Sequence, residues 1–120
     1  LGNWYLDDAR SELATNPNAA IRDTNRVLRL DGANLDAYYV KAAAEARLGN
    51  AGAARSTLLA ATREDPASFV TWTLLGDLEV RLRNFSQAKS FYARAHALDP
   101  LEPGLAGLAA NPASALTGGG

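Results

Sequence analysis

The chain has 120 residues, of which 48% are hydrophobic and 21% are charged, with a formal net charge of −1, no Cys and one His. The missing Cys excludes disulfides, thiolate chemistry and thiolate metal sites, and the near-neutral charge argues against a general nucleic-acid binder. The longest apolar runs fall far short of the roughly 20 residues that span a bilayer. Composition therefore favours one compact domain with a core of its own.

Predicted helices follow one another in pairs along the chain. In chain order they span residues 4–14, 17–30, 35–48, 51–64, 69–82 and 85–98. Asn16, which precedes a proline, is the expected N-cap of the second helix, and Asn34 and Ser68 are the expected N-caps of the third and fifth. Pro66 and Pro100 are expected to end the helices before them, because proline disfavours helix at the preceding residue.

The chain also repeats itself at an offset of about 34 residues. Three sets of positions carry the repeat most clearly, namely the aromatic residues Trp4, Tyr38 and Trp72, the identical Ala20, Ala54 and Ala88, and the identical Asp31, Asp65 and Asp99. These matches need no gap. They predict three copies of one helix–turn–helix unit.

The repeated units resemble the tetratricopeptide repeat (TPR) family. The third unit carries Trp72, Leu75, Gly76, Ala88, Tyr92, Ala95 and Pro100, and the second carries Tyr38, Ala42, Gly49, Ala54, Leu58, Ala61 and Pro66. A large side chain followed one turn later by a small one lets the partner helix approach closely. The resemblance implies an all-α, right-handed TPR solenoid of three helix–turn–helix repeats, at residues 1–34, 35–68 and 69–102, followed by a short C-terminal capping helix.

The first repeat departs from this pattern. The strict register places Asp8 where a small residue should pack. A shift of one residue instead gives Tyr5, Ala9 and Leu13, which restores the pattern. We therefore expect a shifted or partly frayed first helix.

A capping segment is expected at residues 103–116. Leu101, Leu105 and Leu108 form one apolar stripe at helical spacing, which suits a short helix that covers the last repeat. Pro112 is expected to end this helix. The tail at 117–120 is expected to be a flexible linker.

No catalytic, cofactor or metal site is expected. His96 has no nucleophile or orienting acid placed beside it, so packing is its preferred role. Asp7 and Asp8 could be read as paired carboxylates, but adjacent helical residues point about 100° apart, and favourable interaction with the N-terminal end of the helix dipole is the better reading. The glycine tail precedes no helix and is no phosphate loop. The fragment is therefore expected not to be an enzyme.

Arg22, Arg26 and Arg29 fall on one face of the second helix. They could meet phosphates or anionic lipid headgroups. The alternative is a solvated face, which Asp23 and the balanced total charge favour.

The resemblance places the first helix of each repeat on a concave groove. The residues expected to face that groove are Tyr5, Tyr39, Ala43, Arg47, Thr73, Asp77 and Arg81. Arg47 and Arg81 are repeat equivalents, so they should line one wall and could hold a carboxylate or an acidic peptide. The alternative is a set of ordinary exposed charges in a groove whose partner is another part of the same protein. Asp77 and Arg81 could also simply pair across one turn.

TPR domains that bind chaperone tails use a Lys and an Asn one turn apart on the first helix. Here those positions hold Tyr5 and Ala9, or Leu6 and Arg10 in the shifted register. Binding of chaperone C-termini is therefore not expected.

A second resemblance is to the TPR region that follows the membrane spans in bacterial O-antigen ligase or polymerase-like proteins. It involves residues 7–10, 26–31 and 69–78, and ten Arg against two Lys suit a high-GC bacterial gene. Because the chain begins at Leu1 rather than Met, we expect a piece of a longer protein, and this resemblance implies that the longer protein is membrane-anchored elsewhere.

Three functions fit these features. The first is a non-catalytic interaction module that binds a peptide or partner segment in the groove. The second is the accessory domain of a bacterial envelope-glycan ligase, on either side of the membrane. The third is self-association through exposed solenoid ends. All three imply protein partners rather than nucleic acid.

Overall fold

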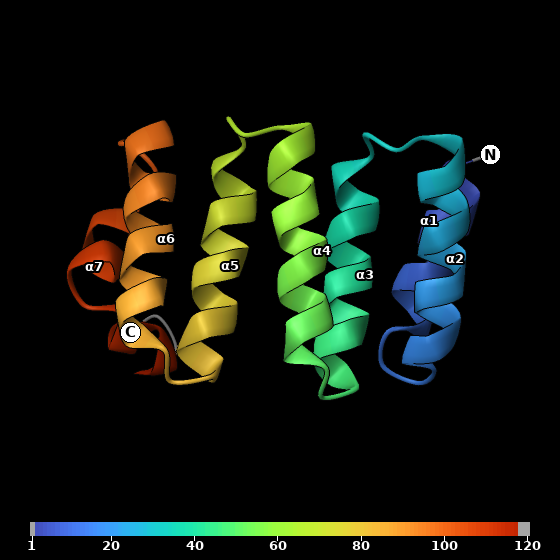
Figure 1. Ribbon diagram of the computed structural model, residues 1–120, viewed down its shortest axis with the longest axis horizontal. Helices are drawn as coiled ribbons and strands as arrows, with labels where there is room; N and C mark the ends of the chain where they lie inside the picture. The colour runs from blue at the N-terminus through green and yellow to red at the C-terminus, as the bar shows by residue number, and fades with distance from the viewer. Residues whose placement is uncertain (1, 118–120) are drawn as a thin grey trace. The chain divides into compact units, whose positions relative to one another are not determined.

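A computed structural model describes residues 2–117, with side chains from Leu6 onward. The described residues form helices and no strand (Figure 1). In chain order these are α1 (Gly2–Glu12), α2 (Pro17–Leu30), α3 (Leu35–Arg47), α4 (Ala51–Glu64), α5 (Phe69–Arg81), α6 (Phe85–Leu98), α7 (Leu105–Ala110) and the 3₁₀ helix η1 (Pro112–Thr117). They divide into two compact units, unit 1 from Leu1 to Asp65 and unit 2 from Pro66 to Gly120.

The predicted helices are confirmed with small shifts at their ends. The second helices α2, α4 and α6 have the predicted bounds. The first helices α3 and α5 end one residue earlier than predicted, because Leu48 and Leu82 serve as their C-caps. Helix α1 begins and ends two residues earlier than predicted.

Asparagine side chains cap three helices of unit 1. The Oδ1 atom of Asn16 accepts a hydrogen bond from a backbone N–H of α2 at 3.2 Å, and those of Asn34 and Asn50 accept equivalent bonds from α3 and α4 at 3.1 Å. Each bond satisfies one of the N–H groups that a helix start leaves without a partner. The caps therefore fix where these helices begin.

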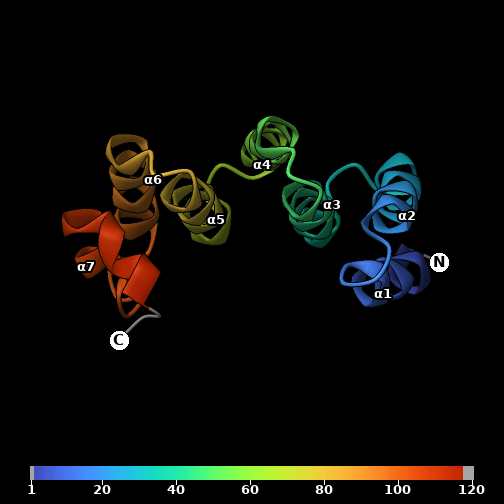
Figure 2. The same cartoon turned by 90° about the horizontal axis from the view of Figure 1, so that it is seen from below.

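The core of unit 1 is built around small side chains. Ala20 and Ala54, which are repeat equivalents, are 0% and 1% exposed, and Ala9 of α1 is also 0% exposed. Alanine lets neighbouring helices approach closely, as α1 and α2 do when viewed end-on (Figure 2). Asp8 is exposed and Ala9 is buried, which confirms the one-residue shift of the first repeat.

Unit 2 contains one helix pair and a C-terminal cap. Tyr92 of α6 is fully buried and forms a cluster with Val80 and Ala88. Leu108 of α7 and Ala115 of η1 pack against this cluster. The cap therefore covers apolar surface that α5 and α6 alone would leave exposed.

Two details of the cap differ from the sequence prediction. Leu101 does not share the stripe with Leu105, because it lies in the turn before α7 and is 92% exposed, whereas Leu105 is buried. Thr117 is not part of a free tail, since it ends η1 and its hydroxyl donates to the carbonyl of Ser114 at 2.7 Å. Residues 118–120 of the expected linker lie outside the described residues.

Equivalent aromatic residues anchor the loops before α3 and α5. The Tyr38 hydroxyl donates to the carbonyl of Gly32 at 3.0 Å, and the Trp72 indole N–H donates to the carbonyl of Pro66 at 3.1 Å. Both bonds reach back six residues to equivalent positions. The repeat seen in the sequence therefore extends to individual side-chain contacts.

Candidate functional site

In unit 1, the residues predicted to face the groove form a row along α3, the first helix of the second repeat. We call the groove-facing side of each repeat's first helix its first-helix face. Tyr39, Ala43 and Arg47 follow one another at intervals of four residues, so they share one face of the helix. Ala43 and Arg47 are exposed, and Tyr39 is half-buried. Asp36, one turn before Tyr39, extends this row with an exposed carboxylate. Asp36 was not among the residues predicted for this face, although its spacing of three residues from Tyr39 places both on one side of the helix.

Polar contacts join this row to α1. The Arg10 guanidinium lies 3.5 Å from the Asp36 carboxylate and 3.6 Å from that of Asp7. The Arg47 guanidinium donates to the carbonyl of Ala14, just beyond α1, at 3.5 Å. Exposed contacts of this kind contribute little to stability. They do orient two arginine side chains along the face, and most of the Arg47 donors are left over for a ligand.

In unit 2, Thr73, Asp77 and Arg81 were predicted to face the groove, and two of them make contacts inside the unit instead. Thr73 is half-buried and its hydroxyl donates to the carbonyl of Phe69 at 2.9 Å, within α5. No ion pair joins Asp77 to Arg81 among the described residues, so the predicted pairing of these two residues is wrong. The Asp77 carboxylate instead accepts a 2.5 Å hydrogen bond from the Tyr92 hydroxyl. Arg81 is exposed.

The contact with Asp77 changes the acidity of Tyr92. Burial raises the pKa of this phenol well above its ordinary value of 10, and the hydrogen bond to Asp77 and its charge raise it further. The hydroxyl therefore remains a donor at neutral pH. Asp77 acts as a structural acceptor inside unit 2, which reduces its part in any ligand contact.

Tyr5 was also expected on the first-helix face. Its side chain lies outside the described residues, so its assignment stays a prediction. The predicted alignment of Arg47 with Arg81 also stays a prediction, because these residues belong to different units.

The other residues considered from the sequence lie in places that do not form a catalytic or metal site. Asp7 and Asp8 are both exposed, and Asp7 pairs with Arg10. The Nδ1 atom of His96 is buried and has no hydrogen-bond partner among the described residues. Within residues 2–117, no group of three or more His, Cys, Asp or Glu side chains could hold a metal ion. No helix in the same range is both long enough and apolar enough to cross a membrane.

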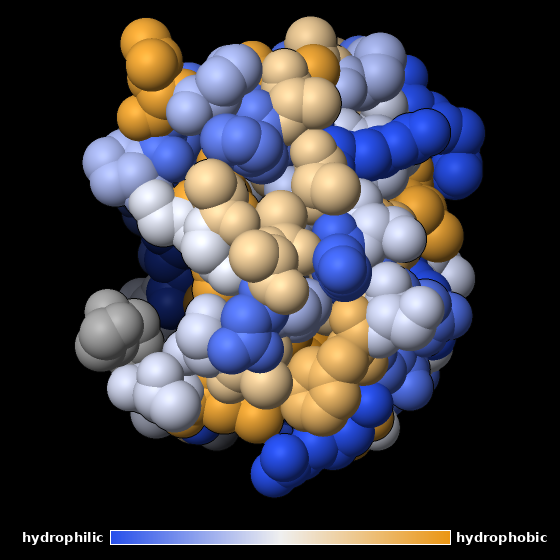
Figure 3. Space-filling view, turned by 90° about the vertical axis from the view of Figure 1, so that its left-hand side faces the viewer, coloured by the Kyte–Doolittle hydropathy of each residue, from blue (hydrophilic) through white to orange (hydrophobic). Residues whose placement is uncertain are grey.

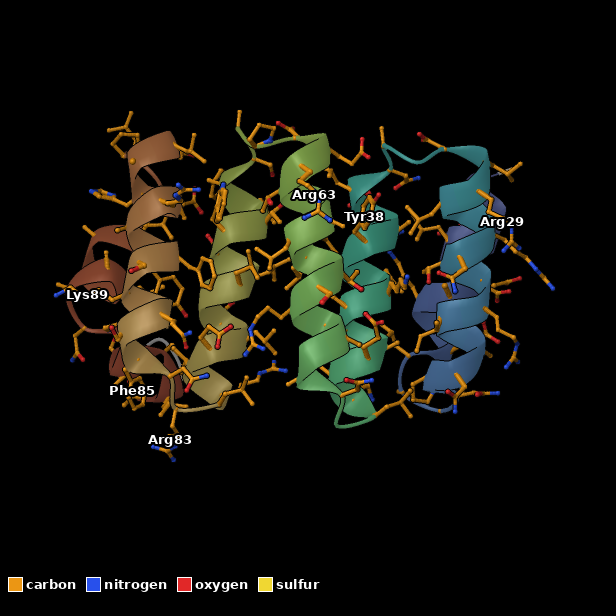
Figure 4. The ribbon with its side chains drawn as sticks, viewed as in Figure 1. Arg29, Tyr38, Arg63, Arg83, Phe85 and Lys89 are labelled. Carbon is orange, nitrogen blue, oxygen red and sulfur yellow. The ribbon has the colours of Figure 1, made fainter. Side chains whose placement is uncertain are left out.

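The basic face of α2 is partly neutralised. Arg26 lies 3.5 Å from the Asp23 carboxylate, and the charge of Arg22 acts on Glu12. Arg29 projects from the end of α2 (Figure 4). The ion pair supports the solvated-face interpretation over a dedicated anion site.

Glu12 of α1 and Asp23 of α2 form an acidic pair that was not predicted from the sequence. A hydrogen bond with Asp23 is the main cause that raises the pKa of Glu12, followed by burial and by the charges of Asp23 and Asp8. In the next repeat, Glu45 accepts a 2.6 Å hydrogen bond from the Thr57 hydroxyl. The shifted register aligns Glu12 with Glu45. The repeat could therefore have predicted that Glu12 contacts the second helix of its own repeat, as Glu45 does.

Similarity to known proteins is found in the structure and not in the sequence. The sequence matches no model of a known protein family. It also matches no curated protein.

The structure is similar to several solved TPR domains. The first TPR domain of human RPAP3 has a TM-score of 0.80 at 18% identity, over 99% of this chain and 94% of that one. The first TPR of Spaghetti (RPAP3), bound to the HSP90 peptide SRMEEVD, has a TM-score of 0.77 at 18% identity, over 97% and 93%. The Yersinia enterocolitica type III secretion chaperone SycD, in complex with a peptide of the translocator YopD, has a TM-score of 0.76 at 14% identity, over 98% and 90%.

These likenesses show that the chain has the all-α TPR helix–turn–helix fold. The fold predicted from the repeat is therefore confirmed.

Proposed function

We propose that this chain is a non-catalytic scaffold module that binds an extended peptide or partner segment on its first-helix faces. The observation that carries the proposal is the row on α3. There the exposed Ala43 separates the half-buried ring of Tyr39 from the exposed guanidinium of Arg47. A small residue between an aromatic ring and a cation leaves room for a peptide backbone. The cation then suits an acidic side chain or a terminal carboxylate.

Structural neighbours support binding of a peptide. The RPAP3 domain is bound to an HSP90 peptide, and SycD is in complex with a peptide of YopD. The ligands themselves do not carry over at this level of identity. Leu6 and Arg10 stand where chaperone-binding TPR domains have Lys and Asn, so the proposed partner is not a chaperone tail.

A peptide array tests the proposal directly. The complete chain is applied to immobilised heptapeptides of varied charge, each present with a free and with an amidated C-terminus. We expect selection of acidic peptides, and weaker binding of the same peptides by Arg47→Glu. Arg29→Glu is the matched control, because it makes the same charge change on α2. Uniform binding regardless of peptide sequence would count against the proposal.

Self-association is a second candidate, favoured by one observation. Leu98, Leu101 and Leu116 of unit 2 are 43%, 92% and 46% exposed. Size-exclusion chromatography with light scattering from 1 to about 500 µM protein would detect it. A constant monomer mass over that range would reject this function.

The proposed role beside a bacterial O-antigen ligase-like enzyme rests on the sequence resemblance alone. The gene upstream of Leu1 is the test. A series of membrane-spanning segments would support this role, and a different upstream domain would reject it.

A further inference from the structure

The turn between α5 and α6 contains an arginine in an unfavourable backbone conformation. Arg83 has a φ of 62°, in the left-handed region that side chains with a Cβ rarely adopt. The equivalent turn of the previous repeat places Gly49 at this position, with a φ of 78°. Glycine is the residue that this conformation favours. Arg83 therefore costs stability at a site where the repeat itself offers a better alternative.

The exposed charges next to Arg83 in the sequence are basic, because the nearby Glu79 is buried and its carboxyl group accepts a hydrogen bond from Asn84. Residues 80–98 contain no Asp or Glu, and neither do residues 103–117 of the cap. The same stretch includes Arg81, Arg83, Lys89 and Arg94. Arg94 lies over the ring of Trp72, 4.6 Å from its centroid. The other three cations are exposed and form no ion pair among the described residues.

Apolar side chains lie among these cations. Leu82, which precedes Arg83, is 39% exposed, and Phe85 at the start of α6 is half-buried. Figure 4 shows Arg83 projecting below the turn, with Phe85 and then Lys89 following along the outer side of α6. In the view of this end of unit 2, hydrophobic and hydrophilic residues border one another along the lower edge (Figure 3).

We propose that Leu82, Arg83, Phe85 and Lys89 form a docking surface for an acidic peptide segment that also carries apolar side chains. We call these four residues the turn surface. The cations supply charge complementarity, and Leu82 and the accessible part of the half-buried Phe85 ring supply apolar contact. The chain has a net charge of −1, which disfavours a polyanion such as nucleic acid as the occupant. The strained arginine is then retained for its side chain rather than for the fold.

This surface is distinct from the row on α3 proposed above. It lies on the α5–α6 turn and the outer side of α6, and it contains none of the residues expected on the first-helix faces. The two proposals can therefore fail separately.

The experiment measures fluorescence anisotropy of a dye-labelled octapeptide of alternating glutamate and leucine, amidated at its C-terminus, with the complete chain. Arg83→Gly is the main variant, because it removes the side chain while relieving the backbone. We expect it to weaken binding at least fivefold and to raise the Tm by about 2–5 °C. Arg83→Lys, which keeps the charge, should retain most of the binding. All proteins compared here carry Arg47→Glu, so that binding of the acidic probe by the row on α3 does not contribute.

Each outcome bears on the proposal. Loss of binding together with a higher Tm separates a binding role from a structural one. Arg29→Gln removes one positive charge from the end of α2 and controls for net charge. If Arg29→Gln weakens binding as much as Arg83→Gly, attraction to the whole protein explains the result and the proposal is overturned. Absence of binding by the Arg47→Glu parent, or equal binding by that parent and Arg83→Gly, overturns it as well.

Discussion

The ring of Tyr92 lies so close to Gly76 that a Cβ atom at position 76 would stand 2.5 Å from Cε1 of the tyrosine. Gly76 is in the middle of α5, where glycine ordinarily weakens a helix. The close approach explains the glycine, because any side chain would push the buried ring away. The hydroxyl of the same ring reaches Asp77, so one tyrosine fixes the spacing of α5 and α6.

Gly76→Leu is expected to destabilise unit 2 by about 3 kcal/mol or more, because the added side chain overpacks the contact with Tyr92. The matched control is Gly52→Ala in α4, where a Cβ would meet nothing closer than 3.9 Å. That variant should be neutral or more stable by up to about 0.5 kcal/mol, since alanine favours helix. Urea unfolding measures both free energies. Equal stability of Gly76→Leu and the wild type would contradict the packing described for this pair.

Tyr92→Phe should cost about 1–2 kcal/mol at pH 7, because Asp77 loses a donor. It should also change the response to alkali. The pKa of Tyr92 is raised above its ordinary value of 10, so the folded state holds the phenolic proton more tightly than the unfolded chain. That stabilisation is complete below pH 10 and is lost as the pH rises beyond it. Unfolding free energies at pH 8 and 11 should therefore differ less for the variant than for the wild type.

Glu12→Gln should stabilise the protein at neutral pH. The pKa of Glu12 is raised above 4.5, chiefly by the hydrogen bond to Asp23, so the folded state favours its protonated form. The contribution of this group is favourable below about pH 4.5 and is lost as the pH rises through the raised pKa. An amide imitates the protonated acid at every pH. The Tm difference between variant and wild type should be positive at pH 7 and shrink toward pH 4, and an unchanged difference would exclude this coupling.

Asn84→Ala should be more damaging than Asn50→Ala, although both residues are helix N-caps. The Asn50 side chain caps α4, and losing such a cap costs about 1 kcal/mol. The Asn84 amide instead donates to the fully buried carboxyl group of Glu79 at 2.9 Å. Loss of that bond should cost about 2 kcal/mol, because the acceptor is cut off from water. Thermal unfolding compares the two, and the reverse order would contradict this role of Asn84.

The fold was predictable because its signals are local or periodic. Proline and asparagine mark helix ends within a few residues, and Ala20, Ala54 and Ala88 recur at positions where only a small side chain fits. The shift in the first repeat was also predictable, since a charged residue cannot take the place of a buried alanine. Leu101 was wrongly assigned to the stripe, because helical spacing between leucines does not show where the helix begins.

The candidate site was harder to predict, since it depends on contacts between helices. The spacing of Asp77 and Arg81 indicated a pair within α5. Spacing within one helix cannot predict a contact from another helix, and here the Tyr92 hydroxyl of α6 donates to Asp77. The conformation of Arg83 was hidden for a related reason. Arg83 takes the position that Gly49 holds in the equivalent turn of the previous repeat, where the backbone is left-handed. An arginine by itself does not predict that conformation.

The central claim is that the row on α3 binds a peptide through Arg47. Its most direct test is the dissociation constant of the best acidic peptide from the array, measured for the wild type, Arg47→Glu and Arg29→Glu. Loss of a charge-assisted hydrogen bond of about 1.5–3 kcal/mol corresponds to roughly 10- to 100-fold weaker binding by Arg47→Glu, with Arg29→Glu close to the wild type. Binding by Arg47→Glu as tight as that of the wild type would contradict the claim.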